Sequence, residues 1–112
     1  MEKVIRIDGR DIVFKSTGAS PLRYKQQFKR DFFADIMRLE DVKGKGDKIN
    51  ANALDLEVFY NLAYIFAKTA DPTILPPLEW LDTFEIFPIM NICTEIQDLL
   101  INSIGVSSSG KK

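Results

Sequence analysis

Three acidic side chains recur at three-residue steps, as Glu79, Asp82 and Glu85. On a helix this spacing places the carboxylates along one side, where oxygen ligands of this kind can bind Mg²⁺ or Ca²⁺. The spacing matches no metal-binding loop, and a solvated helix face is the simpler interpretation. Histidine, the commonest general base and metal ligand, does not occur in the sequence.

The other candidates for chemistry are one cysteine and one glycine-rich segment. Cys93 falls on an apolar stripe, where a small core residue is expected rather than a nucleophile. A single cysteine cannot form an internal disulfide, which favours a reducing compartment. Gly44-Lys45-Gly46 lacks the glycine, lysine and hydroxyl spacing of a phosphate-binding loop. We therefore expect no catalytic residue, no cofactor and no metal, and we do not expect an enzyme.

A basic and aromatic segment is a candidate for contact with a partner. In a helix over residues 21–42, its first cations would lie near the positive end of the helix dipole, and Glu40 and Asp41 near the negative end. Each such placement costs about 0.3–1 kcal/mol when exposed. The segment is interpreted either as a patch placed for contacts, within the chain or with a partner, or as solvated side chains at a small cost. Its candidate residues are Arg23, Tyr24, Lys25, Phe28, Lys29 and Arg30.

Charge is distributed unevenly along the 112 residues. Residues 1–48 contain 12 basic and 8 acidic side chains, a net charge of +4, whereas residues 49–110 contain 1 and 8, a net charge of −7. Complementary potentials of this kind suit self-association, although both regions can equally be solvated. The 8 acidic side chains leave the first region short of a surface that binds phosphates. We expect a homo-oligomer and no nucleic-acid partner.

These residues have to be positioned by one small domain, since 112 residues suffice for a single core. Ser20 before Pro21 is typical of a helix start, with the serine as cap. The predicted fold is mainly α with a small β element. It has a hairpin at 3–15, helices at 21–42, 54–70, 77–86 and 88–104, a surface loop at 43–52, Gly105 as a cap, one globular domain at 1–105 and a flexible tail at 106–112.

The predicted hairpin turns at Gly9 and has two different faces. Ile5 and Ile7 alternate with Val4 and Arg6 along its first strand, so one face can pack while the other stays partly wet. A lone hairpin is marginally stable in water. We expect it to lie on the helices, or on the sheet edge of another subunit.

The helix predicted at 54–70 is apolar on more than one side. A stripe that includes Phe59, Leu62 and Phe66 predicts one buried face, and Tyr60 and Tyr64 fill much of the other. This helix is either the centre of the domain or a centre whose second side meets another chain. We expect Tyr60 and Tyr64 at a second interface, so that changing both to serine keeps the fold and weakens assembly. Trp80, on the next helix, is a further candidate contact residue.

Membrane insertion and secretion are not expected. The helix at 54–70 contains Asp55, Glu57, Asn61 and Lys68, which favours a buried helix of a soluble protein over a bilayer span. Met1 leads directly into a strand pattern, without the charged and apolar regions of a signal peptide.

Several ordered segments resemble one protein family. After the hairpin come GASPLRYKQQFKRD at 18–31, LEVFYNLAY at 56–64, AKTADP at 67–72 and LEWLDTF at 78–84. This order is similar to that of the tail assembly chaperones of long-tailed, siphovirus-type phages and prophages of Gram-positive bacteria. The resemblance covers residues 3 to 104 and involves no catalytic motif.

The resemblance implies a function in the cytoplasm of the host bacterium. Such a chaperone is not an enzyme; it coats the helical tape measure protein and keeps it soluble until tail tube subunits polymerise around it. Family members are also made in a longer, frameshifted form whose extra domain recruits tail tube protein, and Gly110-Lys111-Lys112 is compatible with an A-rich slippery codon run.

Two other functions remain open. A structural or adaptor protein of the phage tail would stay in the finished particle, and mass spectrometry of purified particles would detect it. A small DNA-binding regulator would show salt-dependent DNA binding.

Overall fold

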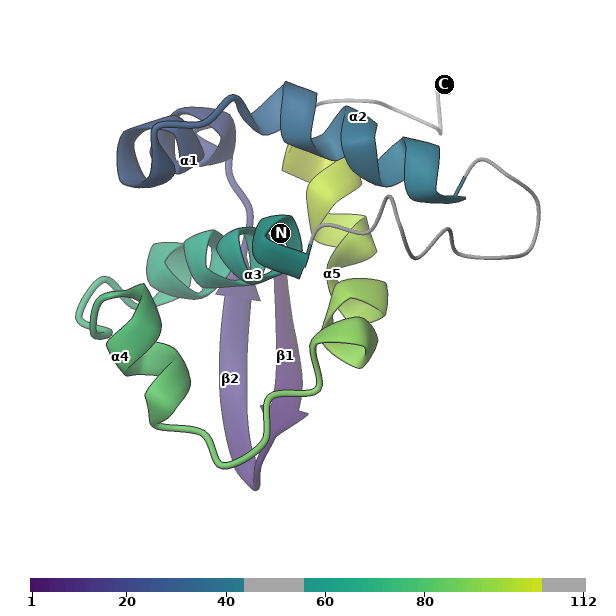
Figure 1. The fold of residues 1–112 in the computed structure, drawn as a ribbon. Coiled ribbons are helices and arrows are strands. Elements are labelled where there is room, and N and C mark those ends of the chain that lie inside the picture. Colours follow the sequence, from purple (N-terminus) through teal and green to yellow (C-terminus); the bar gives the residue numbers. More distant parts are fainter. Residues whose placement is uncertain (44–55, 104–112) are drawn as a thin grey trace.

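The structure, a computed structural model, describes residues 1–43 and 56–103 (Figure 1). Within these residues an N-terminal hairpin is followed by five helices, which confirms the predicted mainly α fold with a small β element. The elements are β1 (Glu2–Ile7), β2 (Arg10–Lys15), α1 (Ser20–Phe28), α2 (Phe32–Lys43), α3 (Leu56–Ala70), α4 (Pro77–Asp82) and α5 (Ile89–Ser103). The loop predicted beyond Lys43, the Gly105 cap and the tail at 106–112 lie outside the described residues.

The hairpin forms as its sequence predicts. Asp8 and Gly9 both have positive φ, 53° and 76°, as a two-residue turn between twisted strands requires. Ile5 pairs with Ile12 across the strands, and on this inner face Ile7 and Phe14 are buried. The expectation that one face packs and the other stays wet is confirmed.

Two helices cover the inner face of the hairpin. α3 passes across the strands and packs on β2, while α5 packs on β1 and on α3 (Figure 1). Polar contacts also join α5 to the hairpin, since Lys3 Nζ lies 3.3 Å from Glu95 Oε1 and Ser16 Oγ donates to Asn102 Oδ1 at 2.8 Å. The two ends of the described chain therefore lie side by side.

The prediction of a single helix at 21–42 is wrong, because this segment forms two helices, α1 and α2. Lys29 adopts the left-handed conformation, with φ 60°. Asp31 Oδ1 then accepts hydrogen bonds from the backbone N–H groups of Phe33 and Ala34, so this aspartate caps α2. Ser20 is not a cap: α1 begins at Ser20 itself, and its hydroxyl oxygen accepts the Thr17 N–H at 3.0 Å.

The break also revises the argument from the helix dipole. Lys25 lies in the last turn of α1 and Asp35 in the first turn of α2, and both are favourable placements. The break thus removes the mismatch expected at Lys25, whereas Arg23 stays in the first turn of α1 and Glu40 and Asp41 stay in the last turn of α2.

α4 ends at Asp82, four residues before the predicted end. The Thr83 hydroxyl donates to the Trp80 carbonyl at 2.6 Å, and the Glu85 N–H donates to Asp8 Oδ2 at 2.8 Å. The chain after α4 is thus held by the hairpin turn instead of continuing the helix.

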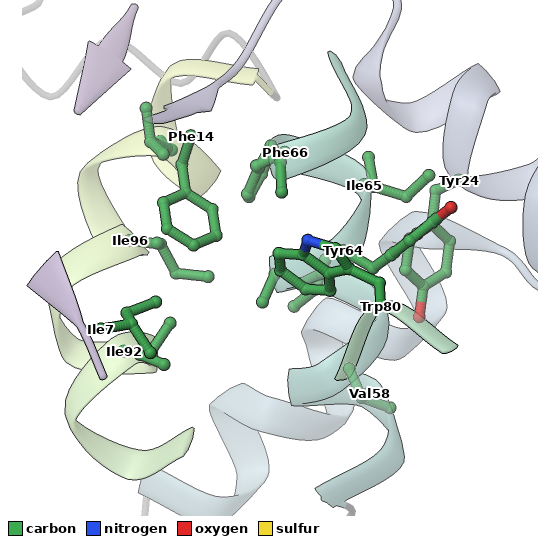
Figure 2. Packing of buried hydrophobic residues seen from close by; sticks show 14 of the residues in the cluster. Ile7, Phe14, Tyr24, Val58, Tyr64, Ile65, Phe66, Trp80, Ile92 and Ile96 are labelled. Carbon is green, nitrogen blue, oxygen red and sulfur yellow. The ribbon is translucent and has the colours of Figure 1, made fainter. Parts of the chain in front are cut away.

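The core surrounds α3 on all sides. Figure 2 shows Ile7, Ile92 and Ile96 grouped between the hairpin and α5, and Tyr64 and Trp80 grouped towards Tyr24 of α1. From Val58 to Ala67, every residue of α3 except Tyr60 is buried. Of the two interpretations of this helix, the structure supports the one in which it is the centre of the domain.

Candidate interaction surface

A buried polar network joins α1, α2 and the start of α3. The Tyr24 hydroxyl donates to Asp35 Oδ2 at 2.6 Å, and Arg30 donates to both carboxylate oxygens of Asp35, from Nε at 2.8 Å and from NH2 at 3.0 Å. Arg30 NH1 also reaches Glu57 Oε1 at 3.3 Å. Two parallel bonds from one guanidinium to one carboxylate form a strong and directional pair.

The helix break makes this network possible. Tyr24 and Asp35 are 11 residues apart, and in a continuous helix that separation would be about 16 Å along the axis. The turn at Lys29 brings α2 back, so that the Asp35 carboxylate meets the Tyr24 hydroxyl. Arg30 therefore acts within the fold, and the interpretation of Arg30 as a solvated cation is wrong.

The environment of the network favours the neutral tyrosine and the charged arginine. Burial, and then the hydrogen bond to Asp35, raise the pKa of Tyr24 well above its usual range. The Asn61 side chain lowers the pKa of Tyr24 and so offsets part of this rise. Its buried Nδ2 nevertheless makes no hydrogen bond within the described residues. The hydrogen bonds to Asp35 raise the pKa of Arg30 further above its already high value.

Three of the predicted contact residues lie in the core instead of at the surface. Tyr24, Tyr64 and Trp80 are 0%, 1% and 3% exposed, so a partner cannot reach them in this structure. The Tyr64 hydroxyl donates to the Leu75 carbonyl at 2.8 Å, and the Tyr64 ring lies edge-on to Trp80, with ring centroids 5.6 Å apart. The expectation that Tyr64 lies at a second interface is therefore wrong, and a serine at position 64 should destabilise the fold.

Phe28 and Tyr60 are half-buried. Phe28 packs between Tyr24 and Tyr64, with ring centroids 5.3 and 6.2 Å away. Tyr60 stacks on Phe87 at 5.8 Å, so an aromatic residue of this chain covers one side of its ring. Neither residue offers a whole aromatic ring to a partner.

The basic residues in and directly after α1 that a partner can reach are Arg23, Lys25 and Lys29, and all three are exposed. Lys29 Nζ donates to the Gln26 carbonyl at 3.1 Å, at the left-handed end of the helix. The basic part of the predicted surface therefore survives, without the aromatic residues predicted beside it.

Sequence reasoning missed an exposed apolar pair on α2. Phe33 and Met37 are 51% and 65% exposed and lie one helical turn apart. Their neighbours Phe32 and Ile36 face the core, and Phe33 and Met37 lie about 100° further around the helix, with the Phe33 ring edge-on to Phe32 at a centroid distance of 5.7 Å. We call this pair the α2 outer face. The periodicity places positions 33 and 37 beside the buried stripe, but their exposure depends on which neighbouring elements cover that side of the helix.

Ionisation of the buried acids links stability to alkaline pH. Burial raises the pKa of Cys93 to about 12, from 9.0, and burial also raises the pKa values of Tyr24 and Tyr64 above 10.0. Since the folded values are the higher ones, the stabilisation is complete below pH 9 and is lost as pH rises. We expect the free energy of unfolding to fall by about 1.4 kcal/mol per pH unit above pH 9 because of Cys93, and to fall more steeply above pH 10, where the two tyrosines ionise in the unfolded chain.

Urea unfolding at pH 8, 9, 10 and 11 measures this dependence. Cys93→Ala removes the group with the lowest unfolded pKa, so its stability should change less than that of the parent between pH 9 and 10. A stability independent of pH over the whole range would contradict the raised pKa values of Cys93, Tyr24 and Tyr64.

Neither a metal site nor a membrane helix is found in the described parts of the chain. No group of three or more Cys, Asp or Glu side chains there is close enough to hold a metal ion. No helix in residues 1–43 and 56–103 is long and apolar enough to cross a bilayer.

Comparison with protein-family models, with curated proteins and with solved structures finds no match. The function is therefore inferred from the residues of this chain. Two surfaces are chemically distinctive: the α2 outer face with the cations that precede it, and the outer face of the hairpin.

Proposed function

We propose that this chain is a phage tail assembly chaperone that binds the tape measure protein and keeps it soluble before tail tube assembly. The order of segments at 18–31, 56–64, 67–72 and 78–84 provides the family resemblance. The proposed protein is not an enzyme, acts in the cytoplasm of the host bacterium and forms homo-oligomers. A longer, frameshifted form would bring tail tube protein to the complex.

The structural observation that supports this proposal is the α2 outer face. A phenyl ring and a thioether that are more than half exposed are costly to leave in water, and an amphipathic helix can cover two such anchors that lie one turn apart. Methionine adapts to partners of irregular shape, which suits a long helical protein with no single repeated contact. The cations at Lys25 and Lys29 lie a short distance before α2 in the chain and favour acidic residues on the same partner.

Co-expression with a tape measure protein tests the proposal. The parent chain should move the tape measure protein into the soluble fraction. Phe33→Ser combined with Met37→Ser should weaken this binding about tenfold to a hundredfold, since two anchors lose their apolar contact. It should lower the free energy of unfolding by about 1 kcal/mol, since Phe33 loses its edge-on contact with Phe32 whereas Met37 is largely exposed.

A matched control changes two other exposed apolar side chains. Leu78→Ser combined with Ile86→Ser removes the same kind of surface at and after α4, and this variant should keep the tape measure protein soluble. Equal binding by both double variants would show that the α2 outer face is not the binding site. A tape measure protein that stays insoluble with the parent chain would refute the proposal. Detection of the chain in purified phage particles by mass spectrometry would favour the tail adaptor instead.

A further inference from the structure

The outer face of the hairpin is an exposed patch with a regular arrangement of charge. Val4 and Val13 pair across the strands, and both are exposed, Val4 by 60%. On the turn side of the valines, Arg6 NH1 lies 2.9 Å from Asp11 Oδ1. On the other side, Lys15 Nζ lies 4.0 Å from Glu2 Oε2. We call these six residues the hairpin outer face.

The signs of the four charges alternate around the valine pair. Along β1 the order is negative, apolar, positive, from Glu2 through Val4 to Arg6. Along β2, the residues that pair with these three have the order positive, apolar, negative. Opposite corners of the patch therefore have the same sign, and adjacent corners have opposite signs.

This pattern is complementary to itself. Turning a second copy over by a twofold rotation about the strand direction places Arg6 opposite Asp11 of that copy, and Glu2 opposite its Lys15. Rotation about the perpendicular direction in the sheet places Arg6 opposite Glu2 and Lys15 opposite Asp11. In both cases every charge meets its opposite and the valines meet valines, as stacked sheets with aligned strands allow. Twofold contacts of this kind are the commonest in homo-oligomers.

We propose that the hairpin outer face binds the same face of a second copy of this chain, with the strands of the two hairpins aligned. The patch has two positive and two negative side chains, so it has no net charge to attract a nucleic acid or a lipid surface. The partner is therefore specified by the pattern of charges on the hairpin outer face and not by the area of this face. The inference deepens the self-association in the proposed function, but it is tested separately because it involves no residue of the α2 outer face.

The contact is weak. Six side chains on two short strands offer much less than the about 800 Å² per partner of a standard interface. We expect a dissociation constant on the order of 0.1–1 mM. The contact weakens as salt rises, because exposed charges are screened beyond about 8 Å at physiological ionic strength.

Sedimentation equilibrium of the full chain measures the dimer directly. The protein concentration should run from roughly 0.05 to 2 mM, because a contact of this size is weak. Val4→Thr combined with Val13→Thr keeps the shape and the strand preference of both residues and removes the apolar centre. We expect this variant to weaken dimerisation about tenfold or more, with an unchanged circular dichroism spectrum. Phe33→Ser combined with Met37→Ser should leave dimerisation unchanged, which separates this contact from tape measure binding.

A second pair of variants tests the charge pattern. Glu2→Gln with Asp11→Asn removes the attraction in both arrangements, and it should weaken dimerisation about fivefold to twentyfold at low salt. Exchanging both ion pairs, by Glu2→Lys, Arg6→Asp, Asp11→Arg and Lys15→Glu, restores complementarity with the same net charge. This quadruple variant should dimerise within about threefold of the parent, because every pair is re-formed.

Three results would overturn the inference. The first is a chain that remains monomeric in low salt at a protein concentration of roughly 2 mM, the highest concentration in the experiment. The second is a dimer that the threonine variant forms as well as the parent. The third is a quadruple exchange that retains its fold but weakens dimerisation as much as the neutral variant does.

Discussion

Tyr64→Ser should destabilise the domain by about 4 kcal/mol, which lowers the melting temperature by roughly 20 °C. The Tyr64 side chain is fully buried at the centre of the aromatic cluster, and serine leaves a cavity between α3 and α4. Folded domains are stable by only about 5–15 kcal/mol, so this loss is a large share of the total. Thermal unfolding followed by circular dichroism measures it.

Two controls separate the contributions of Tyr64. Tyr64→Phe removes only the hydrogen bond to the Leu75 carbonyl and should cost about 1 kcal/mol. Tyr60→Ser, at the half-buried neighbour stacked on Phe87, should cost about 1–2 kcal/mol. If Tyr64→Ser were no more harmful than Tyr60→Ser, Tyr64 would have to lie at the surface, as first expected from the sequence.

Asp35→Ala should destabilise the domain by about 3 kcal/mol. It removes the carboxylate that accepts hydrogen bonds from the Tyr24 hydroxyl and from two nitrogens of Arg30. The tyrosine is fully buried and the arginine is half-buried, so water can replace only part of what is lost. Urea unfolding of the variant and the parent at neutral pH measures the difference.

Glu57→Ala is the matched control for Asp35→Ala, because Glu57 contacts the same guanidinium from an exposed position. Exposed ion pairs contribute about 0–1 kcal/mol, and we expect a loss in that range. Equal losses for the two variants would mean that the Asp35 network does not hold α1 and α2 together. A loss at Asp35 several times larger would identify it as the contact that fixes the angle between these helices.

The hairpin and the apolar stripe of α5 could be predicted from the sequence because their patterns are local. Alternation along β1 separates Ile5 and Ile7 from Val4 without knowledge of the rest of the chain. The same holds for the repeat that buries Ile92, Ile96 and Leu99. Each pattern needs only one partner surface, whatever that surface is.

The helix break at Lys29 could not be predicted from periodicity, because apolar residues continue through it at helical spacing. The break is stabilised by the Asp31 cap and by the hydrogen bond between Tyr24 and Asp35, which are 11 residues apart. The prediction of which residues contact a partner failed for a similar reason. Whether Tyr64 is a surface residue or a core residue depends on α4 packing against it, and nothing in the sequence of α3 specifies that.

The contacts between the hairpin and α5 have a consequence for synthesis of the chain on the ribosome. The strands are made first, but Ser16 and Asn102, which are hydrogen-bonded to each other, are separated by 86 positions. At about 5–20 residues per second, the nascent hairpin waits roughly 4–17 s for the helix that completes its core. During that interval Ile7 and Phe14 lack their contacts with α5. Among the described elements, α5 is therefore made last and is the one that completes the core.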